Sequence, residues 1–154
     1  MIEENKKSDS LITLFETKKS LTITLLRARE SLMMSFRPML AKHNFTEQQW
    51  RVLRVLGEKG PCVAGQLAAE ACILSPSLSR IINTLIENNF IIKKEDRLDK
   101  RKIILEISDE GKMKLESIKP EYLAILKSIQ KRYGEDKIKK ILDLLTEVIE
   151  WRSR

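Results

Sequence analysis

Residues 75–108 read "SPSLSRIINTLIENNFIIKKEDRLDKRKIILEIS", and this stretch decides the fold. Its first half carries apolar residues at the spacing of an amphipathic helix. These residues are Leu78, Ile81, Ile82, Leu85 and Ile86. Ser75 stands where an N-cap is expected, and Pro76 stands at the first helical position, where its missing N–H costs nothing. Asparagine tolerates the left-handed conformation, so "ENN" at 87–89 should end this helix.

The second half of the stretch predicts a β-hairpin. Residues 90–94 and 102–107 are strand-like, because β-branched and apolar residues recur in both. A turn of mixed charges separates them, and its acids at 95–96 receive no role from the sequence. Asp99 would repel phosphate if it were free. We therefore expect Asp99 to accept hydrogen bonds from Arg101 or from a nearby backbone N–H, and so to hold the turn in shape.

Two shorter helices are expected before this stretch. Thr46 and Gln49 form a capping box that opens the first, and Gly57 with Gly60–Pro61 should end it. A second short helix is expected at about 63–71, and "CIL" is a tight connection to the helix that follows. Two short helices joined by a tight turn and followed by a hairpin predict a winged helix-turn-helix.

Long amphipathic helices flank this lobe. Residues 11–41 are largely helical in pattern, with Pro38 expected to kink or end the regular part. Ser108 should cap a helix that runs to about Tyr133, with a kink at Pro120, and a last helix is expected at about 136–151. The terminal helices look too apolar for a monomeric surface. They predict an α-helical dimer interface, although packing on their own domain is an equal alternative.

The predicted fold is therefore mainly α: a winged helix-turn-helix with a small β-hairpin wing and an α-helical dimerisation region from both termini. We expect residues 1–10 to form a mobile tail. Residues 11–41 and 108–154 should build the dimerisation region, and residues 42–107 the DNA-binding lobe of a single structural domain.

Composition limits the classes of function. The 154 residues carry a net charge of +7, which favours a polyanionic partner. No apolar run approaches the roughly 18–20 residues of a membrane span, and the polar N-terminus lacks a signal peptide, so we expect a cytoplasmic protein without a membrane partner. With one histidine and no nucleophile motif or phosphate-cradling loop, the sequence predicts neither an enzyme nor a metal or cofactor site.

The predicted recognition helix keeps small polar groups and one guanidinium on the face that the core does not use. Such side chains can approach base edges and phosphates in the major groove of double-stranded DNA. Together with the first turn of the helix, the DNA-contacting set is Ser75, Pro76, Ser77, Ser79, Arg80, Asn83 and Thr84. The alternative is an ordinary solvated polar face.

The hairpin turn would meet the DNA backbone or the adjacent minor groove. A narrow minor groove concentrates negative potential and favours arginine, so Arg101 is the expected groove probe, with Asp99 as its brace. Phosphates should face Arg97, Lys100 and Lys102. Taken alone, this turn would be interpreted as a solvated charged loop, and its position beside the helix pair favours DNA.

Several segments together resemble the MarR family of bacterial transcription regulators. They are "TEQQWRVLRVL", "SPSLSRIINTLIENNFIIKKEDRLDKRKIILEIS" and "DEGKMKL", and the Asp99-Lys100-Arg101 triplet matches the wing signature of the family. More narrowly, "SLTITLLRARE", "FRPMLAKHNFTEQQWRVLR" and "ACILSPSLSRI" are similar to the regulators of homoprotocatechuate (hydroxyphenylacetate) degradation genes.

The resemblance implies a homodimer on a palindromic operator, and usually repression that a small aromatic, here phenolic, carboxylic acid relieves. It also implies a ligand site near the first helix and the "KHNFTEQQW" loop. Arg29 could pair with a carboxylate, His43 could donate to a phenol or acid, and Trp50 could supply an aromatic wall. Each has an alternative: Arg29 salt-bridged to an acid elsewhere in the fold, His43 as a surface residue of a loop and Trp50 in the core.

Two other functions stay open at this point. One is a winged-helix nucleic-acid-binding protein without small-molecule control. The other is a redox-sensing regulator, because Cys72 precedes the recognition helix and its oxidation could move that helix. Against the second stands the usual role of free cysteines at apolar positions, which for Cys62 and Cys72 is that of small core residues.

Overall fold

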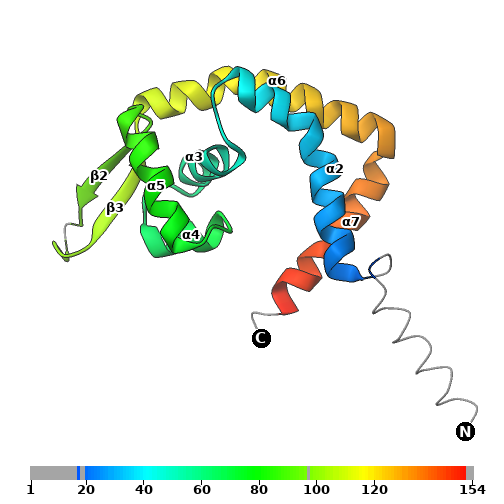
Figure 1. Ribbon diagram of the computed structural model, residues 1–154, viewed down its shortest axis with the longest axis horizontal. Helices are drawn as coiled ribbons and strands as arrows, with labels where there is room; N and C mark the ends of the chain where they lie inside the picture. Colours follow the sequence, from blue (N-terminus) through cyan, green and yellow to red (C-terminus); the bar gives the residue numbers. More distant parts are fainter. Residues whose placement is uncertain (1–16, 18–19, 97, 152–154) are drawn as a thin grey trace, which may run out of the picture. The chain divides into compact units, whose positions relative to one another are not determined.

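The computed structural model describes residue 17 and residues 20–96 and 98–151, and it is mainly helical as predicted (Figure 1). The chain divides into two compact units, residues 1–38 and residues 39–154. The expected tail at 1–10 lies outside the described residues.

Helix α2 (Leu21–Lys42) belongs to the first unit over most of its length. The expectation that the helix begins at residue 11 falls mostly outside the described residues, and the described helix begins at Leu21. Pro38 was expected to kink or end the regular part: it does not end it, because the helix continues through Pro38 to Lys42, and the kink stays a prediction.

The first helix of the lobe is α3 (Glu47–Lys59). Its capping box is confirmed: the Thr46 hydroxyl accepts from the Gln49 backbone N–H at 3.1 Å, and the Gln49 side chain accepts from the Thr46 N–H at 2.9 Å. Gly57 lies inside the helix and does not end it, whereas Gly60, with φ of 84°, is the C-cap. The buried face consists of Trp50, Val52, Leu53 and Leu56.

The helix pair of the motif is α4 (Ala64–Glu70) and α5 (Ser75–Glu87), the predicted recognition helix. The N-cap of α5 is Leu74 and not Ser75, so Ser75 and Pro76 both lie in the first turn. The predicted end is confirmed, because Asn88 is the C-cap and Asn89 adopts a left-handed φ of 60°.

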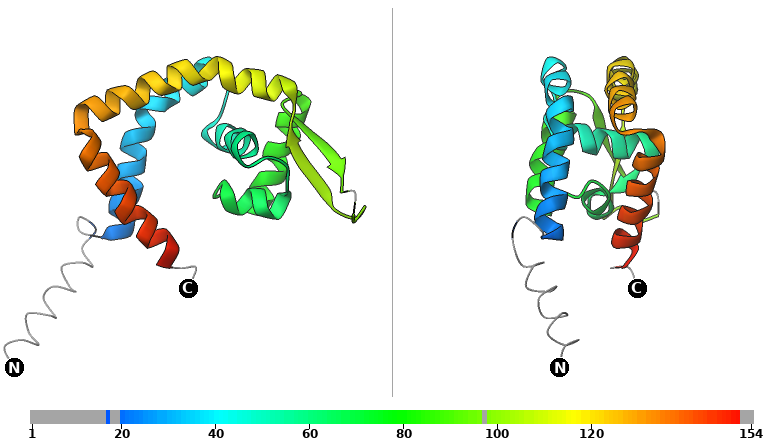
Figure 2. Two further views of the ribbon diagram at one scale, coloured as in Figure 1. Left: turned by 180° about the vertical axis from the view of Figure 1, so that it is seen from behind. Right: turned by 90° about the vertical axis from the view of Figure 1, so that its right-hand side faces the viewer.

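The sheet has three antiparallel strands: β1 (Cys62–Val63), β2 (Ile91–Glu95) and β3 (Ile103–Ile107), in the order β1-β3-β2. Figures 1 and 2 show β2 and β3 extending as a hairpin away from helices α3 to α5. Strand β1 was not predicted, because two residues carry no periodicity of their own. It pairs with β3 at Cys62–Leu105 and so attaches the hairpin to the helices.

Two helices complete the second unit: α6 (Asp109–Tyr133) and α7 (Glu135–Trp151). Ser108 caps α6 as predicted by accepting from the Gly111 N–H at 2.9 Å, and Gly134 ends the helix, which continues through Pro120. Helix α7 buries none of its residues within this single chain. Among the described helices, none combines the length and the apolar character that crossing a membrane requires.

Candidate nucleic-acid interface

Helix α5 separates its residues as the sequence predicts. Leu78, Ile81, Ile82 and Leu85 are buried. The predicted DNA-contacting side chains lie in the exposed remainder, apart from one half-buried threonine. The exposed members are Ser75, Pro76, Ser77, Ser79, Arg80 and Asn83. This surface has no bulky charged side chain other than Arg80, so it can approach the floor of a groove closely.

Thr84 is the half-buried member of the set. Its hydroxyl donates to the backbone carbonyl of Arg80 at 3.2 Å, one turn earlier in α5. The first turn of α5 contains no acidic residue, so the positive end of the helix dipole is not neutralised there. A helix beginning of this kind favours an approaching phosphate.

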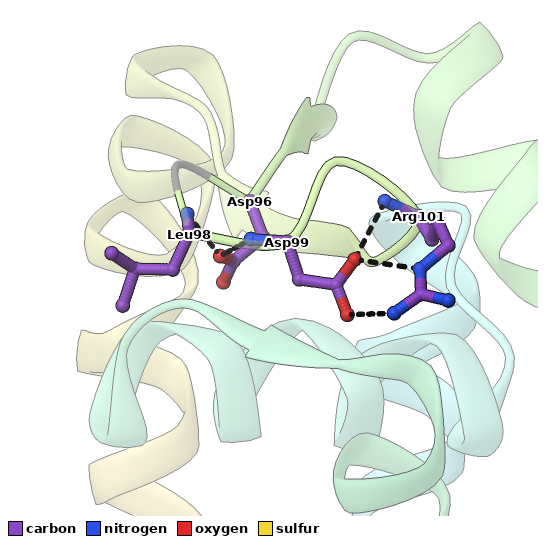
Figure 3. A network of polar contacts seen from close by, with 4 residues as sticks. All are labelled: Asp96, Leu98, Asp99 and Arg101. Atoms are coloured by element: carbon purple, nitrogen blue, oxygen red, sulfur yellow. Dashed lines mark hydrogen bonds and ion pairs between the residues drawn. The ribbon is translucent and has the colours of Figure 1, made fainter.

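The wing turn is built around the expected Asp99–Arg101 contact (Figure 3). Asp99 Oδ1 accepts from the backbone N–H and from Nε of Arg101, each at 3.1 Å, and Asp99 Oδ2 accepts from Nη2 at 3.5 Å. The Arg101 side chain nevertheless remains 91% exposed. Asp99 therefore orients the guanidinium and leaves it accessible.

Asp96 is a wing residue to which the sequence assigned no role. Its Oδ1 accepts from the backbone N–H groups of Leu98 at 2.7 Å and Asp99 at 2.9 Å. These bonds, the one from Asp99 first, lower the pKa of the Asp96 carboxyl below its ordinary value, because they favour the charged form. The side chain of an aspartate in a turn often accepts from the backbone N–H two residues later. An aspartate at position 96 of a predicted turn was therefore the signal that the sequence offered for this role.

Two further cations of the wing turn are exposed. Lys100 and Lys102 lie on the turn with Arg101, and Arg97 lies outside the described residues. Farther down the hairpin, Lys94 forms an ion pair with Glu106 across β2 and β3 at 2.5 Å. Lys94 is thus neutralised by a carboxylate of the neighbouring strand, and exposed cations remain at the tip.

The structure places His43 and Trp50, two of the predicted ligand-binding residues, against consecutive residues of α6. His43 Nε2 lies 2.9 Å from Glu121 Oε1, which also accepts from Lys42 Nζ at 3.0 Å. The Lys42 bond, followed by the His43 bond, lowers the pKa of Glu121 below its ordinary value. The Trp50 and Tyr122 ring centroids are 5.8 Å apart.

Trp50 is buried, with 6% of its surface exposed, yet its indole N–H has no hydrogen-bond partner among the described residues. Beside it, Arg54 Nη1 donates to the Tyr122 hydroxyl at 2.8 Å, and the Arg54 guanidinium carbon lies 4.8 Å from the ring centroid of Tyr122. The sequence singled out neither Arg54 nor Tyr122. Their contact spans 68 positions, so no local pattern could have indicated it.

Arg29, the third predicted ligand-binding residue, lies on α2 in the first unit. Its Nη1 is 2.7 Å from Glu30 Oε1, and Glu30 also pairs with Arg37. Arg29 therefore pairs with the adjacent acid of its own helix, whereas the alternative foreseen for it was an acid elsewhere in the fold.

The two cysteines differ in environment. Cys62 is buried, and burial, followed by the charge of Glu70, raises the pKa of its thiol, which disfavours the reactive thiolate. Cys72 is exposed and adopts a left-handed φ of 50° in the turn before α5. The expectation of a small core residue is thus confirmed for Cys62 and wrong for Cys72, because the tight turn directs Cys72 outward.

Comparisons with known proteins agree with this geometry. The model of the MarR family matches residues 45–103, which contain α3 to α5 and most of the wing. The HTH-type transcriptional regulator FarR of Neisseria gonorrhoeae is 37% identical over 129 residues, covering 84% of this chain and 88% of that protein. The homoprotocatechuate degradative operon repressor of Escherichia coli is 35% identical over 130 residues, with the same two coverages.

Solved structures lead to the same group. The transcriptional regulator PA4135 superposes with a TM-score of 0.83 at 37% identity, covering 85% of this chain and 96% of that one. NadR in complex with 4-hydroxyphenylacetate has a TM-score of 0.76 at 37% identity, with coverages of 84% and 92%. The predicted resemblance is confirmed, including its narrower form. On its sequence, its winged helix-turn-helix and these relatives, the chain belongs to the MarR family of transcriptional regulators.

Proposed function

We propose that this protein is a sequence-specific repressor that binds a palindromic operator as a homodimer and is released by a small phenolic carboxylic acid. The observation that carries the proposal is the exposed polar face of α5 next to a wing whose Arg101 is oriented by Asp99 and remains 91% exposed. Helix α5 would read base edges in the major groove, and Arg101 would enter the adjacent minor groove.

We assign DNA binding and dimer formation to the segments that the sequence predicted for them. Residues 42–107 would contact DNA, residues 11–41 and 108–154 would form the dimer, and phosphates would face Arg97, Lys100 and Lys102. Support for the dimer comes from α7, which exposes Ile141, Leu142, Leu144, Val148, Ile149 and Trp151. A second copy of the chain is the occupant we propose, since a two-fold dimer sets two recognition helices roughly one DNA turn apart.

The effector class is supported by the relatives and by the cluster around Trp50. One relative is named for the homoprotocatechuate operon, and NadR was solved with 4-hydroxyphenylacetate. In this chain the Trp50 N–H, the Arg54 guanidinium and the Tyr122 ring offer a donor, a cation and an aromatic face, which are the groups that a phenolic acid requires. His43 and Arg29 remain proposed contributors.

Release would follow from differential binding. The acid must bind more tightly to a dimer conformation that fits the operator poorly than to the one that fits it well. We further propose that the protein acts in the cytoplasm, where it has access to DNA, and acts by binding without catalysis, since its relatives are named as regulators and repressors.

The test begins with selection of duplexes by the purified protein from a randomised DNA library. The affinity for the selected duplex is then measured with and without 4-hydroxyphenylacetate and related acids. We expect one palindromic duplex to be enriched and the acid to weaken its binding. Arg101→Ala should lose most of the affinity while Glu95→Ala, a change at the end of β2, keeps it. Enrichment of no sequence, or wild-type affinity in Arg101→Ala, would contradict the proposal.

A further inference from the structure

Leu98 is an apolar side chain at the tip of the wing, and 99% of its surface is exposed. Turns of this kind are normally built from Gly, Pro, Asn, Asp and Ser, and a leucine there adds nothing to the turn itself. A single exposed leucine carries little information in general. The surroundings of Leu98 are what make it informative.

The backbone around Leu98 is held in place by four hydrogen bonds. Asp96 Oδ1 accepts from the Leu98 N–H at 2.7 Å and from the Asp99 N–H at 2.9 Å. The Asp96 N–H donates to the Lys102 carbonyl at 3.0 Å, and the Lys102 N–H donates to the Asp99 carbonyl at 2.8 Å. The described residues of the tip are therefore organised before any partner binds, which reduces the entropy lost when Leu98 is covered.

Leu98 and Arg101 project from the same small turn in different directions. In Figure 3 the Leu98 side chain lies on one side of Asp96, and the Asp99–Arg101 pair lies on the other side. A turn that places the Arg101 guanidinium in a minor groove about 6 Å wide brings its flanks against the groove walls. These walls are formed by deoxyriboses, whose C–H surfaces are apolar.

We infer that Leu98 is a DNA-contacting residue, which packs against the deoxyribose wall of the minor groove while Arg101 occupies the groove. The inference rests on the proposed DNA-binding function and extends it. It assigns the wing two kinds of contact: a charged one that depends on salt, and an apolar one that does not. Covering a leucine removes apolar surface from water and releases no counterion from DNA.

The experiment compares Leu98→Ser, Leu98→Met and Lys100→Ala in the full-length protein, on a duplex selected by the wild-type protein, over a series of salt concentrations. Leu98→Ser should weaken binding by about tenfold with an unchanged slope of log affinity against log salt. Leu98→Met keeps the apolar surface and should stay near the wild-type affinity. Lys100→Ala should lower the slope by about 1, as expected for one lost phosphate contact.

Hydrogen exchange at the Asp99 amide separates a contact from a structural effect. It should be the same in Leu98→Ser as in the wild-type protein, because Asp96 holds backbone groups that the substitution keeps. Affinity of Leu98→Ser within twofold of the wild-type value, a change in its salt slope, or faster exchange at Asp99 would overturn the inference alone. A wild-type protein that selects no duplex would overturn the proposed function as well.

Discussion

Single carboxylates determine how the wing presents its cations. Asp96 captures two backbone amides, and Asp99 captures the Arg101 backbone and guanidinium. Both carboxylates accept hydrogen bonds inside the turn, so both act on its conformation. Glu95 accepts no such bond from the described amides of the turn, and it lies at the end of β2, opposite Ile103. Glu95 and Asp96 are adjacent and carry the same charge, but only Asp96 holds the turn. Substitutions at these two positions can therefore be compared directly.

Asp96→Ala should loosen the wing tip, whereas Glu95→Ala removes the same charge and should not. We expect faster hydrogen exchange at the Leu98 and Asp99 amides and weaker operator binding in Asp96→Ala only.

The order of the wing tip should also depend on pH, because the pKa of Asp96 is lowered. The charged carboxylate holds the tip at pH values above the ordinary aspartate pKa, and the contribution is lost as pH falls through the lowered pKa. An NMR titration of the Leu98 amide would measure this midpoint, and a midpoint above the ordinary value would contradict it.

Trp50→Phe should separate ligand binding from stability. The indole N–H is buried without a partner among the described residues, so its removal takes away no hydrogen bond to any of them. A hydrogen bond to a charged ligand contributes roughly 1.5–3 kcal/mol, so the affinity for 4-hydroxyphenylacetate should fall by about tenfold or more. Trp151→Phe makes the same change within the proposed dimer surface of α7, and because phenylalanine keeps an apolar ring there it should leave the dimer and the affinity unchanged. Calorimetric titration of both variants with 4-hydroxyphenylacetate measures the two affinities. Equal affinities of Trp50→Phe and Trp151→Phe would remove Trp50 from the ligand site.

At the scale of elements, the junction between the wing and α6 depends on a close backbone approach. Ser108 Oγ donates to the Asn89 carbonyl at 2.5 Å and accepts from the Gly111 N–H, so one hydroxyl connects the end of α5 to the start of α6. A Cβ on Gly111 would lie 2.3 Å from the Phe90 carbonyl oxygen and 2.7 Å from Ile107 Cγ1. The backbone of α6 at Gly111 therefore lies close against Phe90 and Ile107, at the base of the hairpin.

Gly111→Ala should therefore destabilise the protein by roughly 2 kcal/mol or more, because a backbone carbonyl has to move. Gly65→Ala is the matched control, since Gly65 lies in helix α4 and a Cβ there meets nothing within 4 Å. It should be neutral or stabilising by up to about 1 kcal/mol. Denaturant unfolding of the two variants tests this, and equal stabilities would show that the approach at Phe90 relaxes freely.

At the scale of the whole molecule, the second unit has a surface that one chain does not cover. Helix α7 follows the amphipathic spacing predicted for it, yet all its large apolar residues remain at least partly exposed. Association with a second copy would bury them, and stability would then depend on protein concentration.

Ile141→Glu should convert the dimer to a monomer and abolish operator binding, because it places a charge in the apolar face of α7. Lys139→Glu introduces the same side chain on the polar face of the same helix and should remain dimeric. Light scattering after size exclusion measures both masses, and circular dichroism confirms that the lobe stays folded. A wild-type protein that is monomeric at micromolar concentration would contradict the proposed dimer.

Local interactions explain what the sequence by itself determined. The amphipathic α5, the capping box at Thr46, the Ser108 cap and the hairpin all rest on residues a few positions apart, so their patterns are visible without a structure. The Asp99–Arg101 contact was predictable for the same reason, since it spans two residues.

Only the tertiary structure decided which distant residues meet. Strand β1 forms because β3 offers it a partner more than 40 positions away. The N-cap of α5 is Leu74, one residue before the predicted Ser75. His43 meets Glu121 across 78 positions, and Trp50 meets Tyr122 because α3 packs on α6. Such pairings depend on how helices pack, and hydrophobic periodicity indicates which face is buried but not which residue it will contact.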